Sequence, residues 1–143
     1  MRRHFREHRL KPFVLISRPV VPAAIEMLIT VCDILPRVDL GGDRRRDFAL
    51  VAGCAQALQL ASPERIDDKL LDEFPRLQVI ACTFRLPEHI DVAACTRRGI
   101  WVTNVAMRRE DAEAEIEAAR NILDVLSGDI PRGAVNEILL PAA

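Results

Sequence analysis

The sequence predicts an α/β domain built on one parallel β-sheet with helices on both faces. Two observations lead to this fold class. From residue 12 onward, short apolar runs alternate with amphipathic stretches, which is typical of βα units joined into a parallel sheet. The chain has 143 residues and half of them are hydrophobic, so it is long enough to bury a core of its own.

Apolar runs predict five strands, at residues 13–17, 33–38, 57–61, 77–83 and 100–104. The stretches between them predict helices near residues 22–31, 44–54, 63–74 and 88–97. In the third helix, Ser62 can cap the first turn, Pro63 suits the first helical position, and Ile66, Leu70 and Phe74 share a face. Because parallel strands need crossovers that cover both faces of the sheet, we expect a five-stranded doubly wound α/β fold. Among the strand orders open to such a sheet, we choose the flavodoxin-like order 2-1-3-4-5.

A long last helix is predicted at residues 107–127. Its predicted buried stripe consists of residues at helical spacing, and Gly128 is placed to end the helix in a left-handed conformation. The stripe is Ile116, Ala119, Leu123 and Leu126. An irregular tail follows at residues 129–143. Residues 1–10 form a predicted basic, solvated arm. Residues 11–143 form one predicted domain, made of residues 11–104 together with the helix and tail over residues 107–143.

The composition excludes several classes of partner. The formal net charge is −1, which gives no overall field to attract nucleic acid or an anionic membrane. The arginine run at residues 44–46 has no interleaved aromatic residues, so we interpret it as a solvated face. No membrane-length apolar stretch or signal peptide is recognisable, so we expect a cytoplasmic protein. The widely spaced Cys32, Cys54, Cys82 and Cys95 are expected to be buried, reduced thiols.

In such a sheet, ligands bind at the carboxyl ends of the strands, which points to the loops after Ser17, Ala61 and Thr83. The first loop, residues 17–22, has two prolines and no glycine, so it lacks the amides that a flavin phosphate needs. Arg18 and Ser62 stand where a receiver domain would need carboxylates for magnesium. The sequence has neither a glycine-rich dinucleotide fingerprint nor a nucleotide phosphate-binding loop. The residues therefore predict no bound cofactor and no metal site.

Two blocks of the chain carry a longer pattern. Residues 75–80 read PRLQVI and residues 89–104 read HIDVAACTRRGIWVTN. This pattern resembles the D-isomer-specific 2-hydroxyacid dehydrogenases, most closely their phosphite (phosphonate) dehydrogenase branch. In that family a P-x-L-x-V-I strand leads to a substrate loop and then to N-F/I-D-V-x-A-C-T-x-R-G-I/V-x-V-T-N. Residues 115–128 and 131–136 resemble the C-terminal helix and tail of the same family.

The resemblance implies a substrate-binding domain that lacks its nucleotide-binding partner. In the family, the strand that corresponds to residues 100–104 is followed by an entire NAD-binding domain, which supplies the glycine-rich loop and the catalytic Arg, Glu and His. Here residues 105–107 join the two blocks almost directly. We therefore expect this chain to have no catalytic residue and to bind no NAD, the cofactor of the parent family.

The resemblance also places the candidate site in the substrate loop. Arg85 stands where the phosphite-oxidising branch has a lysine that contacts substrate, so the positive charge is kept. Leu86 replaces a family glycine, which restricts the backbone, and His89 replaces an asparagine. The predicted weak small-anion site consists of Phe84, Arg85, Leu86 and His89. The alternative is that Arg85 and His89 are exposed loop residues paired with Glu88 or Asp91, with Asp91 favoured at a helix N-terminus.

Three hypotheses about function follow. The first is an isolated substrate-binding domain that binds a small anion weakly. The second is a structural or self-associating module without a ligand, a homodimer formed through the apolar surface that a missing domain would leave. The third is one part of an NAD-dependent oxidoreductase that acts with a separate nucleotide-binding domain.

Overall fold

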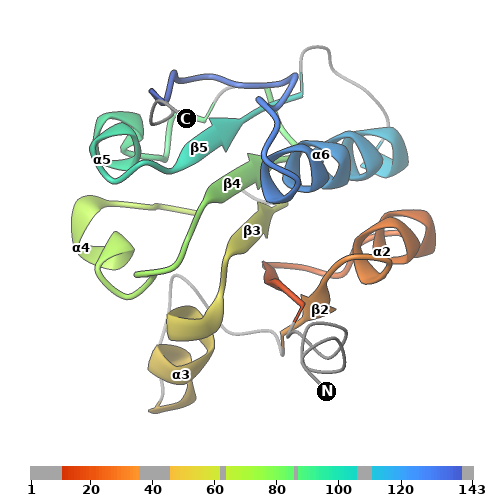
Figure 1. The fold of residues 1–143 in the computed structure, drawn as a ribbon, viewed down its shortest axis with the longest axis horizontal. Coiled ribbons are helices and arrows are strands. Elements are labelled where there is room, and N and C mark those ends of the chain that lie inside the picture. Colours follow the sequence, from red (N-terminus) through yellow and green to blue (C-terminus); the bar gives the residue numbers. More distant parts are fainter. Residues whose placement is uncertain (1–10, 36–45, 62–63, 86, 106–110, 140–143) are drawn as a thin grey trace, which may run out of the picture.

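A five-stranded sheet runs through the molecule in the computed structural model, which describes residues 11–35, 46–61, 64–85, 87–105 and 111–139 (Figure 1). The strands are β1 (Phe13–Ile16), β2 (Asp33–Ile34), β3 (Ala57–Leu60), β4 (Val79–Cys82) and β5 (Trp101–Thr103). They are ordered β2-β1-β3-β4-β5 and each neighbouring pair is parallel. The predicted flavodoxin-like α/β fold and its strand order are therefore confirmed.

Helices cover both faces of the sheet, as predicted (Figure 1). The helices α3 (Arg46–Cys54), α4 (Asp68–Leu71) and α5 (Val92–Arg97) pack on one face. The helices α2 (Pro22–Ile29) and α6 (Asp111–Leu126) pack on the other. Because both faces are covered, every residue of β3, β4 and β5 is buried, which explains why these strands are mostly apolar and do not alternate apolar with exposed polar residues.

Two predicted helices begin later than the periodicity indicated. The predicted helix at residues 63–74 is wrong at both ends, because α4 contains only Asp68–Leu71. Ile66 forms an isolated parallel bridge with Ile90, so both segments are extended just before their helices. The carboxylate of Asp67 then accepts a hydrogen bond from Leu70 N at 2.8 Å, which caps α4. Asp91 caps α5 in the same way through Ala94 N at 3.0 Å, so the helix predicted from residue 88 begins at Val92.

The helix α6 lies across the sheet on the same side as α2. Its buried residues in the core on this face are Ala118, Ala119, Ile122 and Val125. The predicted stripe was therefore displaced: Ala119 is buried, whereas Ile116, Leu123 and Leu126 are partly buried at its margins. Gly128 has a φ of 87°, and the left-handed prediction at this position is confirmed.

The tail after α6 is more ordered than the predicted irregular segment. We call residues 131–136 the C-terminal strap. Ala134 forms an antiparallel bridge with Thr103, and Val135 N donates to Val102 O at 2.7 Å. The side chain of Asn136 continues this pairing, since it accepts from Val102 N at 2.9 Å and donates to Ile100 O at 2.9 Å. The strap therefore covers the outer edge of β5.

Several other predictions concern surfaces. The expectation of four buried thiols is wrong for Cys54, which is the last residue of α3 and is exposed, whereas the other three cysteines are buried. The basic arm over residues 1–10, the end of the second predicted strand over residues 36–38, and Ser62 and Pro63 lie outside the described residues. The side chains of the arginine run at residues 44–46 also lie outside them. No helix in the described ranges is both long and apolar enough to cross a membrane.

Candidate functional site

The predicted substrate loop begins at the carboxyl end of β4, at the edge of the sheet where ligands bind in this class of fold. The main chain leaves the sheet at Thr83, whose N–H donates to Leu60 O at 3.0 Å. Phe84 is half-buried and packs against the core on the α3–α5 side, whereas the side chain of Arg85 is exposed. Leu86 lies outside the described residues. A cationic side chain therefore stands on a loop that is anchored by its aromatic neighbour.

The backbone of this loop is tied to the residues that follow β5. The side-chain amide of Asn104 donates from Nδ2 to Arg85 O at 2.7 Å. The next residue, Val105, donates its N–H to Phe84 O at 3.3 Å. Two consecutive carbonyl groups of the loop are thus held by two consecutive residues of a distant segment, so the Cα of Arg85 has a defined position while its guanidinium remains accessible to solvent.

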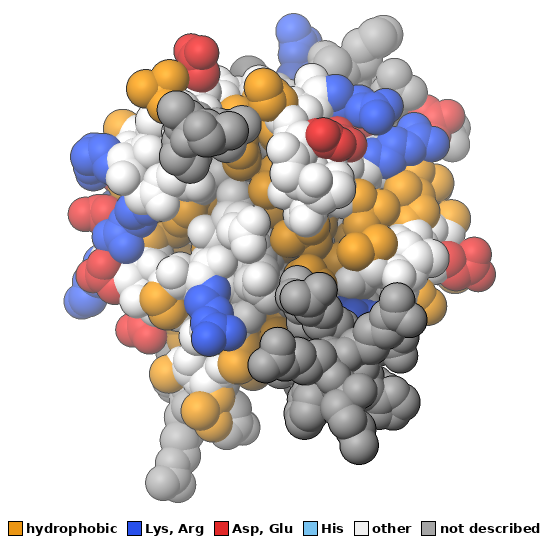
Figure 2. All heavy atoms as spheres, viewed as in Figure 1, with side chains coloured by type: hydrophobic (Ala, Val, Ile, Leu, Met, Phe, Trp, Pro, Cys, Tyr) orange, Lys and Arg blue, Asp and Glu red, His pale blue; other side chains and the backbone are white. Residues whose placement is uncertain are grey.

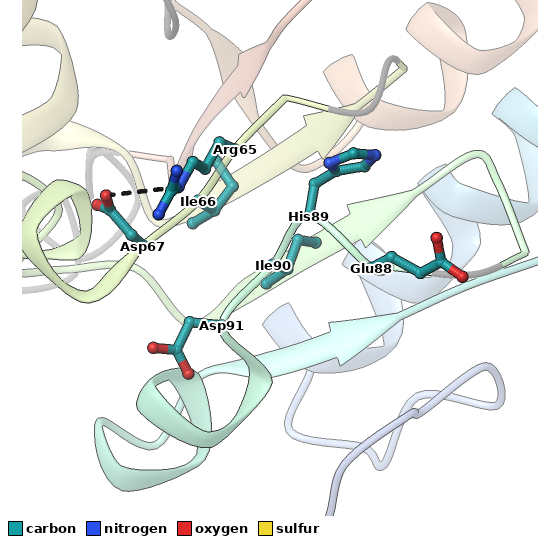
Figure 3. Close-up of a pocket in the computed structure, with 7 residues that line it drawn as sticks. All are labelled: Arg65, Ile66, Asp67, Glu88, His89, Ile90 and Asp91. Atoms are coloured by element: carbon teal, nitrogen blue, oxygen red, sulfur yellow. Dashed lines mark ion pairs between the residues drawn. The ribbon is translucent and has the colours of Figure 1, made fainter.

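His89 lies in a different environment from Arg85. It lines an open pocket of about 400 Å³, together with Arg65, Ile66, Asp67, Glu88, Ile90 and Asp91 (Figure 3). Arg85 is not among the described residues that line this pocket. The structure therefore separates the two polar members of the predicted site. Sequence reasoning missed Arg65, although a signal existed: residues 65–67 and 89–91 both read basic residue, isoleucine, aspartate.

The pocket around His89 is poorly arranged for an anion. Figure 3 shows the guanidinium of Arg65 turned toward Asp67, with an Arg65 Nε to Asp67 Oδ2 distance of 4.0 Å, and the ring of His89 turned away from that pair. The lining contains three carboxylates and one guanidinium, so its field disfavours a negative ligand. Of the two candidate positions, the loop that carries Arg85 is better suited to anion binding.

The turn between β1 and α2 is where a dinucleotide phosphate binds in many sheets of this kind, at the free amides of a helix N-terminus. Here Val21 N donates to Glu115 Oε2 of α6 at 2.5 Å. Pro22, the first residue of α2, has no N–H to offer. A carboxylate of the protein itself thus occupies the position, and the residues of this turn do not fit the pyrophosphate of NAD.

The buried cysteines do not provide a nucleophile. Burial raises the pKa of Cys82 to about 12 and that of Cys95 to about 12. Burial, with a contribution from Asp33, also raises the pKa of Cys32 to about 11. These thiols stay protonated near neutral pH, and the thiolate is the reactive form. Within the described ranges, no cluster of three or more His, Cys, Asp or Glu side chains could hold a metal ion.

Comparison with known proteins identifies a protein family whose model matches most of this chain. The family model described as "D-isomer specific 2-hydroxyacid dehydrogenase, catalytic domain" matches residues 14–136. A glyoxylate reductase of Aeropyrum pernix is 32% identical over 120 residues, which cover 80% of this chain and 36% of that protein. A glyoxylate/hydroxypyruvate reductase of Arabidopsis thaliana is 39% identical over 68 residues, which cover 48% of this chain and 21% of that protein.

Solved structures show the same likeness. The 2-hydroxyacid dehydrogenase of Ketogulonicigenium vulgare superposes with a TM-score of 0.55 at 27% identity, covering 68% of this chain and 30% of that one. This chain spans well under half the length of each of these three relatives.

Proposed function

Since the chain belongs to the D-isomer specific 2-hydroxyacid dehydrogenase family, whose catalytic domain matches residues 14–136, we propose that it is the substrate-binding part of such a protein. It binds a small anion at the loop that carries Arg85, and it does not transfer hydride on its own. A cytoplasmic location is part of this proposal, since its cysteines are free and free thiols are typical of reducing compartments.

The observation that carries this proposal is the position of Arg85. Its side chain is exposed at the carboxyl edge of the sheet, and its carbonyl is fixed by Asn104 at 2.7 Å. A guanidinium offers a planar set of donors that matches a carboxylate or a phosphorus oxyanion. Because the loop is exposed and the described part of the site has only this one cation, we expect the affinity to be weak, with a dissociation constant of about 1 mM.

The ligand class is a small carboxylate or oxyanion. Glyoxylate is the first choice, because the relatives from Arabidopsis thaliana and Aeropyrum pernix are named as glyoxylate/hydroxypyruvate reductase and glyoxylate reductase. Phosphite is the second, because the substrate loop has Arg85 where the phosphite-oxidising branch has a lysine. The finer proposal, membership in the phosphite-oxidising branch, predicts that phosphite binds more tightly than glyoxylate.

Isothermal titration calorimetry of the whole chain tests the proposal. Glyoxylate, phosphite and phosphate are titrated separately at matched ionic strength, with chloride as the reference anion. The variant Arg85→Ala is expected to weaken binding about tenfold, since one charge-assisted contact is lost. Arg65→Ala is the matched control, because Arg65 is also exposed but lines the pocket around His89. Binding that survives Arg85→Ala, or disappears in Arg65→Ala, contradicts the assignment.

The absence of autonomous hydride transfer is tested separately with NADH. Because Glu115 occupies the N-terminus of α2, a titration followed by nicotinamide fluorescence is expected to give no saturable change. Saturable binding of NADH would contradict this part of the proposal. Activity that appears only when a separate nucleotide-binding domain is added would support the third hypothesis, a two-part oxidoreductase.

Self-association is a second candidate function, favoured by exposed apolar side chains. Figure 2 shows hydrophobic side chains gathered over α2 and α6. At the end of α2, Ile29 and Val31 are 48% and 43% exposed. Patches of this kind tend to be covered by a second copy. Light scattering coupled to size-exclusion chromatography is expected to give twice the monomer mass, and a monomer mass at all concentrations contradicts the homodimer.

A further inference from the structure

A continuous set of hydrogen bonds joins α6 to the loop that carries Arg85. In the strap, Gly133 N donates to Asn121 Oδ1 of α6 at 3.0 Å. The carbonyl of the same glycine accepts from Asn104 N at 3.0 Å. The side chain of Asn104 then donates to Arg85 O at 2.7 Å. Asn104 is thus held through its main chain by the strap, and it holds the loop through its side chain.

The main chain of Asn104, in the middle of this set of hydrogen bonds, has little room to move. Asn121 is fully buried, so its side chain has a fixed position. A Cβ on Gly133 would lie 2.6 Å from Asn104 O and 2.7 Å from Asn121 Nδ2, which shows how closely the strap approaches both residues. Because Gly133 fits between them without a side chain, the main chain of Asn104 is positioned by packing as well as by hydrogen bonds.

We propose that Asn104 is a positioning residue for the anion-binding loop, so that the strap and α6 set the place of Arg85 relative to the sheet edge. This inference rests on the proposed function, because it assigns a role toward the same site. Asn104 does not contact the anion in this proposal. Its amide restricts the backbone at Arg85, and the loop therefore loses less conformational freedom when the anion binds.

The test compares two alanine variants of the full chain, Asn104→Ala and Asn136→Ala. Both remove a half-buried amide from the same region. The side chain of Asn136 pairs with Ile100, Val102 and Thr96 and forms no hydrogen bond with the described residues of the loop. Asn136→Ala therefore measures the effect of loosening the strap alone. Asn104→Ala keeps the main-chain bond to Gly133, and circular dichroism checks that both variants are folded.

Two readouts are taken from each variant. The first is the rate of trypsin cleavage after Arg85, identified by mass spectrometry and compared with cleavage after Arg120 in α6. The second is the dissociation constant for glyoxylate by calorimetry. Loss of one hydrogen bond predicts that Asn104→Ala speeds cleavage after Arg85 and weakens glyoxylate binding, each by about threefold to tenfold. Asn136→Ala is expected to change neither by more than about twofold.

The outcomes separate the two levels of the argument. If the wild-type chain binds none of the anions, the proposed function fails and the inference fails with it. If the wild-type chain binds glyoxylate but Asn104→Ala binds it equally well, the proposed function stands and the positioning role is overturned. Equal effects of the two variants also overturn it, because Asn104 then acts only through the stability of the strap.

Discussion

The substitution Gly133→Ala tests the closure of the strap on the sheet. The added Cβ would lie 2.6 Å from Asn104 O and 2.7 Å from Asn121 Nδ2, whereas ordinary contacts begin at 3.4 Å. Asn104 O belongs to the main chain and Asn121 is fully buried, so neither atom can move aside independently. Forcing a methyl group into a filled site of this kind costs about 1–3 kcal/mol.

A second cost comes from the hydrogen bond between Gly133 N and Asn121 Oδ1. If the strap shifts to relieve the clash, this buried oxygen loses its donor, and an unsatisfied buried polar group costs about 1–3 kcal/mol. Because the shift partly relieves the clash, the two costs do not add fully. We predict that Gly133→Ala lowers the free energy of unfolding by about 2–4 kcal/mol.

Urea denaturation followed by tryptophan fluorescence measures this loss. Trp101 is the single tryptophan; it lies in β5 and is 6% exposed. With a typical dependence on urea for a domain of this size, the midpoint falls by about 1–2 M. Gly53→Ala is the control, because its Cβ would meet no atom within 4 Å in α3 and alanine favours a helix by up to about 1 kcal/mol. An unchanged or higher midpoint for Gly133→Ala would show that the strap does not approach Asn104 and Asn121 this closely.

Three further predictions concern α6 and the cysteines. Glu115→Gln is expected to lower the free energy of unfolding by about 1 kcal/mol, because the hydrogen bond from Val21 N then goes to a neutral acceptor. An unchanged urea midpoint would count against that contact. The buried thiols of Cys82 and Cys95 have a pKa raised from 9.0 to about 12, so the folded chain keeps protons that the unfolded chain releases. The free energy of unfolding therefore falls as pH rises from about 9 toward 12, by up to about 1.4 kcal/mol per pH unit for each thiol. In a variant with both Cys82→Ala and Cys95→Ala, the urea midpoint is expected to fall less steeply with pH than in the wild-type chain. With a maleimide on the native protein, the exposed Cys54 is expected to react first, and equal labelling of all four cysteines would contradict the described burial.

The parallel sheet with helices on both faces was predictable from the sequence because it depends on the number of apolar runs and the helices between them. The strand order was chosen among the orders that such a sheet allows. The bounds of α4 were not, because Ile66, Leu70 and Phe74 fit a helical period equally well. What decides the start of α4 is the bridge from Ile66 to Ile90, a contact with a segment that lies elsewhere in the sequence. The local pattern contains no information about this pairing, and the cap by Asp67 becomes recognisable only once the pairing is known.

The place of the candidate loop in the fold was predictable to a similar extent. The resemblance placed Arg85 in a loop after the fourth strand, and the structure places it there. It separates His89 from Arg85, because the pairing of residues 66 and 90 places His89 at the pocket that it lines together with Arg65. The contact of Glu115 with Val21 spans 94 residues, and only the packing of α6 beside α2 brings the two together.

Anion binding at the loop that carries Arg85 is tested most directly by an amide NMR titration of the whole chain with glyoxylate. Saturable shifts are expected only for the amides of Phe84, Arg85, Asn104 and Val105, and these shifts are expected to disappear in Arg85→Ala. Shifts centred on Arg65 and His89, or no saturable shift at a glyoxylate concentration about tenfold above 1 mM, would contradict it.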